Sequence, residues 1–398
     1  MGSLRVVVEG VGAAPFGKHL HRSLRDLAEE AAVEALKDAG VTADDVDAVF
    51  FSNSVAGIVT GQEAIRGQTA LRGTGLLGKP VFNVENACAS GSSAFLLARN
   101  GILAGTWQTV LVVGAEKMFH EDRIVPYRAL ASAADLSDLP EEAASGASPV
   151  FMELYAERTR GYMERTGATA ADFAEVVVKA RAHAAGNPIA QYRGQVTADE
   201  VLTSGDVVPP LTKFMCSPIS DGAAAVVLSS AKAAEPGPIV QVEVLASQLV
   251  TGNPLHDGDP AGYVAEAARR AYEEAGVGPG EVDVVELHDA AAPAELEYSE
   301  ALGLCGPGEG PSLLRQGATR LGGRVPINTG GGLIARGHPM GATGVAQIRE
   351  IALQLRGDAG ERQVQGARIG LVQNAGGSVG GASAASAVHI LARRSRSR

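Results

Sequence analysis

The chain has 398 residues, 45% of them hydrophobic, and a formal net charge of −11. This length predicts two similar-sized units or one duplicated core. The acidic balance argues against a nucleic-acid-binding protein, because such proteins present a basic face.

The three cysteines, Cys88, Cys216 and Cys305, are far apart and odd in number. They form neither a disulfide framework nor a paired metal-ligand spacing, so we expect no bound metal and a reducing compartment. The sequence shows no signal peptide and no run of roughly 18 apolar residues. A cytoplasmic protein without a membrane span is therefore expected.

The first part of the chain alternates strand and helix patterns. The helix pattern ends at Gly40, a residue typical of the position after a helix. Strands are predicted at Leu4–Gly10, Val46–Ser52, Pro80–Val84, Thr109–Gly114 and Ser217–Ser230, and an amphipathic helix at Ser23–Ala39.

Cys88 follows the strand Pro80–Val84 and precedes a helix opened by small residues. Free N–H groups and the helix dipole at such a position favour a thiolate. The stretch therefore suits a nucleophile approached closely by a substrate. A small buried apolar cysteine is an equally common reading of this stretch by itself.

An internal repeat organises the chain. Ala35–Phe50 (ALKDAGVTADDVDAVF) and Ala271–Glu286 (AYEEAGVGPGEVDVVE) share a helix end, an acidic turn and a strand. PVFN at Pro80–Asn83 matches VPIN at Val325–Asn328 more loosely, and the strand Val110–Gly114 matches Ile369–Gln373. The repeat predicts two α/β halves, each a doubly wound and largely parallel sheet, packed with the active site where their strand ends meet.

A segment without a counterpart separates the halves. We place the first half at 1–118 with 214–235, the inserted domain at 119–213 and the second half at 236–398. Helices are predicted at Val150–Arg165 and Thr169–Ala185. An insertion of this size usually covers a site. Its arginines either meet a phosphate-bearing substrate or form a solvated face; they are Arg158, Arg160, Arg165, Arg181 and Arg193.

Two histidines and a glycine-rich stretch follow strands of the second half. His288 follows Val282–Leu287, and His338 lies in a glycine-rich loop before a helix. Backbone N–H groups of QNAGGSVGG, Gln373–Gly381, either bind an oxyanion or form a tight turn. With Cys88 these groups suit acyl transfer through a thioester, in which a histidine takes the thiol proton.

The chain resembles the thiolase superfamily, and within it the sterol-carrier-protein-x type thiolases and related bacterial acyltransferases. The resemblance implies a five-layered αβαβα fold built from two βαβαβαββ halves with an inserted loop domain that holds coenzyme A. It also implies at least a homodimer. The matching stretches are NVENACASGSSA, GAEKM, PISDGAAAVVL, VDVVELHDAAAPAELEYSEALGLC, INTGGGLIARGHPMGATG and QLRGDAGERQVQGARIGLVQNAGG.

The resemblance also implies roles for single residues. Cys88 corresponds to the acyl-accepting nucleophile, His338 to the histidine that activates it, and His288 to the residue that binds the thioester oxygen. The N–H groups of Cys88 and Gly376 correspond to an oxyanion hole, and Asn328 to a residue supporting it. No cofactor beyond a coenzyme A thioester substrate is implied.

One departure concerns the second cysteine that thiolases use at the α-carbon. At its two family positions this chain has Asn374 and Ala290, neither of which acts as an acid or base at neutral pH. Cys216 and Cys305 are read as structural. Either a histidine does the α-proton chemistry, or the nucleophile arrives as an already activated carbon, by decarboxylation or as an electron-rich ring, or turnover is lost. The expected substrate that donates the acyl group is an acyl-CoA or an acyl-carrier thioester.

The leading hypothesis is an acyltransferase that makes or breaks a carbon–carbon bond next to an acyl-CoA thioester. The first alternative is a thiolase-like retro-aldolase working with a small OB-fold zinc-ribbon partner. Tyr298, near the predicted site, leaves this alternative open. The second alternative is a lipid-binding or scaffold subunit that has lost its chemistry.

Overall fold

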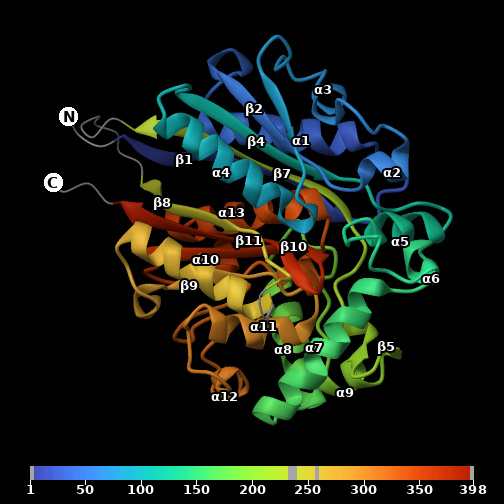
Figure 1. The fold of residues 1–398 in the computed structure, drawn as a ribbon. Helices are drawn as coiled ribbons and strands as arrows, with labels where there is room; N and C mark the ends of the chain where they lie inside the picture. Colours follow the sequence, from blue (N-terminus) through green and yellow to red (C-terminus); the bar gives the residue numbers. More distant parts are fainter. Residues whose placement is uncertain (1–3, 232–239, 256–259, 395–398) are drawn as a thin grey trace.

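The computed structural model describes residues 4–231, 240–255 and 260–394. Its core is a nine-stranded sheet in the order β3-β2-β4-β7-β1-β8-β11-β10-β9 (Figure 1). Five strands come from the first half of the chain and four from the second. The predicted boundary between residues 235 and 236 lies outside the described residues. The strands are β1 (Arg5–Gly17), β2 (Ala48–Ser52), β3 (Val81–Val84), β4 (Thr109–Glu116), β7 (Asp221–Ala231), β8 (Gln241–Val250), β9 (Val284–Glu286), β10 (Ile369–Val379) and β11 (Ala382–Arg394).

The pairing pattern differs from the predicted one. Parallel pairs join β2 to β3, β2 to β4, and β9 to β10, and the other five pairs are antiparallel. The prediction of largely parallel sheets is therefore wrong. The reason is that the last strand of each half runs back against its neighbours: β11 returns from β10 through a hairpin, and β7 runs antiparallel to both β4 and β1. The halves also share one continuous sheet, because β1 pairs with β8.

Helices complete the predicted five layers (Figure 1). Helix α1 packs on the outer face of the first half, and α10 and α11 pack on the outer face of the second. Between the two halves lie α4 and α13, whose apolar side chains meet strands of both halves in one core. These helices are α1 (Leu24–Ala39), α4 (Ser90–Leu103), α10 (Pro260–Ala275), α11 (Ala292–Ala301) and α13 (Met340–Arg356).

Helix α1 begins and ends where its sequence signals indicate. The Ser23 hydroxyl accepts a hydrogen bond from the Asp26 N–H, and the Asp26 carboxylate accepts one from the Ser23 N–H. Gly40 closes the helix with φ of 68°. In β1, a Cβ on Gly10 or Gly12 would lie within 2.4 Å of the α1 backbone. These glycines let the helix sit close to the sheet.

The central helices cross at glycines near their N-terminal ends. A Cβ on Gly344 would lie 2.6 Å from the Ser92 nitrogen, and one on Gly91 would lie 2.8 Å from the Val345 nitrogen. Real Cβ atoms do not come this close to backbone atoms. The glycine contact therefore brings the starts of α4 and α13 together, and with them the residues that precede each helix.

Substituting Gly344→Ala is expected to push α4 and α13 apart and so to reduce both stability and activity. Overpacking of this kind costs about 1–3 kcal/mol, and a displacement near 1 Å at a reacting pair lowers activity by up to about 100-fold. Chemical denaturation and turnover assays measure the two effects. Gly280→Ala is the matched control, because nothing lies within 4 Å of a Cβ there. Equal effects in both variants would contradict the proposed role of the crossing.

The inserted segment forms a helical unit with its own core, which includes Phe173 and Val177 and extends to Leu296 of α11. The two helices predicted in it are α7 and α8, with bounds shifted by one residue at one or both ends. The segment contains α5 (Ile124–Ala131), α6 (Glu141–Ala144), α7 (Val150–Thr166), α8 (Ala170–Ala184), α9 (Ala198–Leu202), β5 (Asp206–Val208) and β6 (Leu211–Thr212). The remaining short helices are α2 (Ala56–Thr60), α3 (Arg66–Ala70) and α12 (Gly310–Arg315).

Two further predictions about the second half are corrected. The segment Val325–Asn328 is not a full strand, since it contributes only the single bridge between Ile327 and Val285. QNAGGSVGG does not follow the last strand either: most of it lies within β10, and β11 comes after it. Among the described residues, no helix combines the length and apolarity that crossing a membrane requires.

Candidate active site

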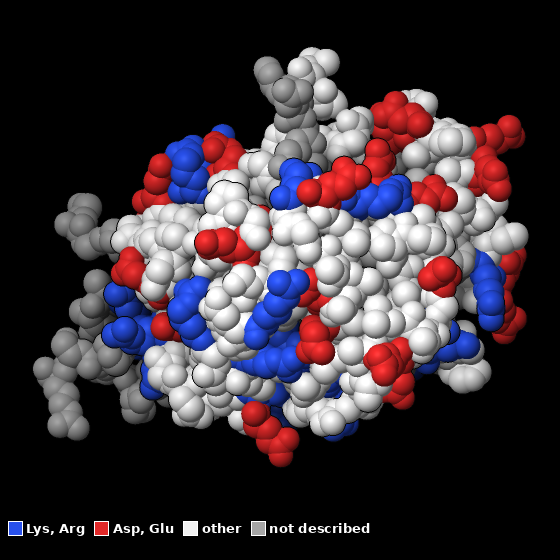
Figure 2. Space-filling view, turned by 90° about the horizontal axis from the view of Figure 1, so that it is seen from below, with Lys and Arg blue, Asp and Glu red and all other residues white. Residues whose placement is uncertain are grey.

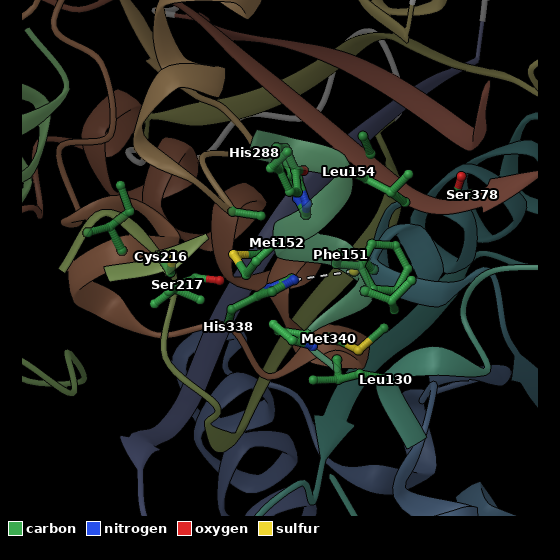
Figure 3. A pocket seen from close by; sticks show the side chains of 18 of the residues that line it. Leu130, Phe151, Met152, Leu154, Cys216, Ser217, His288, His338, Met340 and Ser378 are labelled. Carbon is green, nitrogen blue, oxygen red and sulfur yellow. Dashed lines mark hydrogen bonds between the residues drawn. The ribbon is translucent and has the colours of Figure 1, made fainter. Parts of the chain in front are cut away.

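A cavity of about 860 Å³ opens between the strand ends of the core and the inserted segment (Figure 3). Cys88, His288 and His338 line it together with residues of α7 and of β10. The inserted segment thus forms one wall of the site, as its size led us to expect.

A strained turn places Cys88 between β3 and α4. Cys88 is the middle residue of the 3-10 turn Ala87–Ala89, and Ala87 has φ of 48°, in the left-handed region. Such a conformation costs on the order of 1–3 kcal/mol. Asn86 stabilises the turn, because its N–H donates to the Ser90 hydroxyl at 2.9 Å and its side-chain amide donates to the Ser93 hydroxyl at 3.0 Å.

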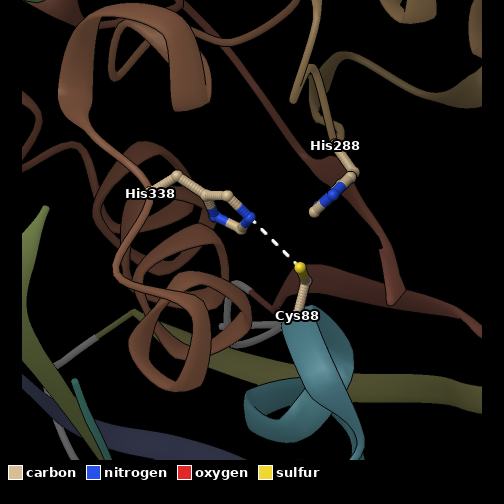
Figure 4. Close-up of side chains that lie close together, drawn as sticks. All are labelled: Cys88, His288 and His338. Carbon is tan, nitrogen blue, oxygen red and sulfur yellow. Dashed lines mark hydrogen bonds between the residues drawn. The ribbon is translucent and has the colours of Figure 1, made fainter. Parts of the chain in front are cut away.

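His338 lies directly opposite Cys88, just before α13 (Figure 4). Its Nε2 is 3.2 Å from the Cys88 Sγ, and its Nδ1 is 2.7 Å from the Thr343 hydroxyl. The single hydroxyl proton of Thr343 is donated to the Pro339 carbonyl at 3.0 Å. Therefore His338 Nδ1 carries the ring proton and donates to Thr343, and Nε2 is left as the acceptor for the thiol proton.

Burial keeps this pair neutral. It raises the pKa of the Cys88 thiol to about 12, and the Glu116 carboxylate adds to the rise; N–H groups of Gly377 and Cys88 act in the opposite direction but are outweighed. Burial, helped by the charge of Arg336, lowers the pKa of His338 to about 3. Both shifts favour a thiol hydrogen-bonded to a neutral imidazole over the thiolate expected from the position at the helix N-terminus.

His288 completes the group from the end of β9. Its ring meets that of His338 edge to face, with centroids 5.1 Å apart. One nitrogen of each histidine and the Cys88 sulfur all lie within 4.8 Å of one another. Burial lowers the pKa of His288 well below its usual value, and the neighbouring His338 ring and the Arg158 charge add to this. The sequence motifs that contain these three residues are far apart, and the fold brings them together.

β10 passes directly beneath the Cys88 turn. A Cβ on Gly376 would lie 2.4 Å from the Ala89 nitrogen and 2.9 Å from the Cys88 nitrogen, so only glycine fits there. Of the N–H groups that lower the thiol pKa, the one from β10 belongs to its neighbour Gly377. Both glycines line the cavity, and backbone N–H groups of two segments, at Gly377 and Cys88, lie at the reacting sulfur, where they could also serve an oxyanion.

The other predicted residues lie around this centre. Asn328 does not line the cavity; its side-chain oxygen accepts from the Leu287 N–H at 2.8 Å and so holds the segment before His288. Asn374 is buried, with its amide nitrogen 3.3 Å from His288 Nδ1. Ala290 lines the cavity but offers no acid or base there.

Neither remaining cysteine replaces the second thiol. Cys216 lines the cavity, but its Sγ donates to the Thr212 carbonyl at 3.4 Å and its pKa is raised to about 12 by burial. Cys305 lies outside the cavity, packed against the outer core of the second half.

Several residues at the site were missed from the sequence. Thr343, which orients His338, lies one helical turn into α13. Its position in the GATG motif was the sequence feature that could have identified it. Gln347 contacts Asn374 beside His288 from α13, and no sequence pattern marks it. Gln373 belongs to the predicted QNAGGSVGG stretch, but its side-chain contact with the His288 N–H was not expected. Sequence alone left the role of Arg158 open. Its guanidinium donates to Glu297 at 2.5 Å and lies over the rings of Tyr155 and Tyr298.

Comparisons with known proteins identify the family of the chain. A family model described as the N-terminal domain of thiolase matches residues 6–232, and one described as thiolase C-terminal domain-like matches residues 260–393. The chain belongs to the thiolase family. Within this family it is an acyltransferase enzyme.

Individual relatives cover almost the whole chain. Acetyl-CoA acetyltransferase of Methanothermobacter thermautotrophicus is 42% identical over 98% of this thiolase-family chain and 99% of its own length. Human sterol carrier protein 2 is 37% identical over 95% of the chain and 70% of its own length. The solved structure named Ltp2-ChsH2(DUF35) aldolase superposes with a TM-score of 0.80 at 25% identity, covering 99% of each chain.

Proposed function

We propose that this thiolase-family enzyme takes the acyl group of an acyl-CoA thioester onto Cys88 and then makes or breaks a carbon–carbon bond in a Claisen-type reaction. The observation that carries the proposal is the 3.2 Å hydrogen bond between Cys88 Sγ and His338 Nε2 at the wall of the cavity. As the sulfur attacks the thioester carbonyl, His338 takes the thiol proton. The leaving coenzyme A thiolate takes that proton from His338, which becomes neutral again, and the acyl group stays on Cys88.

Coenzyme A enters from the side of the inserted segment in this proposal. Arg165 and Lys213 line the cavity and are exposed, and Arg181 lines it between the rings of Tyr192 and Phe214. Viewed from this side, the surface carries basic side chains near its middle, although the chain as a whole is acidic (Figure 2). Phosphate groups bind to such positions.

Intact-protein mass spectrometry tests the proposal directly. Brief incubation with a panel of acyl-CoA donors is expected to add the mass of one acyl group per chain, located on the peptide that contains Cys88. The preferred donor then defines the acyl specificity. An adduct on another residue, or no adduct with any donor, would count against the proposal.

The second candidate is cleavage of a β-hydroxyacyl-CoA by a retro-aldol reaction with a small OB-fold zinc-ribbon partner. It is favoured by the likeness to a structure named as a DUF35 aldolase and by the Tyr298 hydroxyl, which lies in the cavity wall 3.4 Å from Arg158. Such a reaction needs no cysteine nucleophile, so Cys88 and its activating histidine favour acyl transfer. Co-purification of a small zinc-binding subunit would strengthen this candidate.

We also propose a homodimer that pairs sheets at β3. Among the described strands β3 pairs only with β2, so its other edge is free, and its Phe82 side chain is 41% exposed. A free edge with an exposed aromatic residue favours association.

A further inference from the structure

We infer that Asn374 and Gln347 are positioning residues that hold His288 in one tautomer, with the ring proton on Nε2. Asn374 stands where the family resemblance expects a second catalytic thiol. In this chain the side chain at this position orients the His288 ring as a hydrogen-bond donor and does not transfer a proton. The effect of this tautomer on catalysis rests on the proposed acyl transfer. The assignment of the tautomer does not depend on that proposal.

The argument starts from a backbone carbonyl that can only accept hydrogen bonds. The Gln347 Nε2 lies 3.1 Å from the Gln373 carbonyl oxygen. The side-chain amide of Gln347 must therefore present its NH₂ group to this carbonyl, and its Oε1 faces the other way.

The next contact extends this orientation to Asn374. Gln347 Oε1 lies 2.9 Å from Asn374 Nδ2, so Asn374 must present its NH₂ group as the donor. Rotating the Asn374 amide by half a turn would place two oxygens against each other. The second N–H of the same group points to His288 Nδ1 at 3.3 Å.

His288 Nδ1 therefore accepts a hydrogen bond and carries no proton. Because burial keeps the ring neutral, its single proton is on Nε2, the outer nitrogen of a ring that points into the cavity (Figure 3). The backbone holds the ring in place as well, since the His288 N–H donates to Gln373 Oε1 at 2.9 Å.

The two histidines thus hold opposite tautomers. His338 presents an unprotonated Nε2 to the Cys88 thiol, and His288 presents an N–H donor to the same space. A thioester carbonyl attacked by Cys88 develops negative charge on its oxygen, and a fixed N–H donor stabilises that charge. The resting site therefore holds one neutral acceptor and one neutral donor, and His338 becomes charged only when it takes the thiol proton.

The Asn374 side chain lowers the stability of the folded protein in this arrangement. Its Oδ1 is buried and has no hydrogen-bond partner among the described residues, a situation that costs about 1–3 kcal/mol. A purely structural residue at this site would be expected to be apolar. The inference thus predicts that an apolar replacement loses activity without losing stability.

The test is ¹⁵N NMR of the histidine side chains in the full-length protein, where protonated and unprotonated ring nitrogens are resolved. The His288 signals are identified by their loss in His288→Asn. Wild-type His288 is expected as the Nε2–H tautomer alone, and Asn374→Leu as a mixture of both tautomers. In Asn374→Leu, kcat/KM for the acyl-CoA donor identified by the labelling experiment is expected to fall about 10-fold or more. The denaturation midpoint of this variant is expected to stay level or rise.

Controls separate this inference from a general disturbance and from failure of the proposed function. Thr343→Val is expected to change the signals of His338 and leave those of His288 unchanged. Gln347→Leu frees the Asn374 amide and is expected to mix the His288 tautomers, which gives a second measurement if Asn374→Leu does not fold. Wild-type His288 protonated on Nδ1, or an unchanged Nε2–H tautomer in both variants, would overturn the inference. The NMR results hold even if no acyl-CoA labels Cys88.

Discussion

Cys88→Ala is expected to abolish formation of the acyl-enzyme and to lower turnover of acyl-CoA by more than about 1,000-fold. The reason is that no other thiol takes the place of Cys88: the Cys216 thiol donates to the Thr212 carbonyl, and Cys305 lies outside the cavity. The backbone donors and histidines that remain provide only residual catalysis. Steady-state turnover and intact mass, measured on the same samples, give the result.

Two comparisons sharpen this prediction. Cys305→Ala removes a thiol away from the site and should keep normal labelling. Cys88→Ser keeps a hydroxyl in place but makes a weaker nucleophile, so it should acylate slowly. If Cys88→Ala cleaves a β-hydroxyacyl-CoA at the wild-type rate, the retro-aldol candidate replaces acyl transfer as the main reaction.

His338→Ala is expected to lower kcat/KM by about 100- to 10,000-fold, the range for loss of a general base. It should also change the pH dependence of Cys88 alkylation by iodoacetamide. In the wild type the histidine pKa is lowered to about 3 and the thiol pKa raised to about 12. Between these values the pair stays as a thiol and a neutral imidazole, and His338 takes the thiol proton as the sulfur attacks. The rate of this His338-assisted reaction should therefore be flat from about pH 5 to pH 9.

Without the imidazole, only the free thiolate reacts. Its fraction rises tenfold per pH unit below the thiol pKa, so alkylation of the His338→Ala variant should rise by that factor over the same range. His21→Ala, at an exposed histidine, is the control and should keep the flat profile. A wild-type rate that rises and levels off near neutral pH would instead show a thiolate–imidazolium pair and contradict the neutral resting state.

Much of this protein could be predicted from its sequence. The repeat between Ala35–Phe50 and Ala271–Glu286 indicated two α/β halves, because similar patterns bury similar faces. The segment between β4 and β7 stood out because it has no counterpart. The positions of Cys88, His288 and His338, each after a strand end, predicted that they would meet, and the structure places them within 4.8 Å of one another.

What the sequence could not determine depends on contacts between distant segments. Strand direction in β7 and β11 depends on how the chain returns across the sheet, and local patterns do not encode it. The pKa of the Cys88 thiol is raised by burial and by Glu116 more than the nearby backbone N–H groups lower it. The tautomers of the two histidines depend on hydrogen bonds from Thr343 and Asn374. Sequence by itself therefore determined which groups meet in this enzyme. Only the tertiary structure, through desolvation and hydrogen-bond direction, decided which of them accept protons and which donate them.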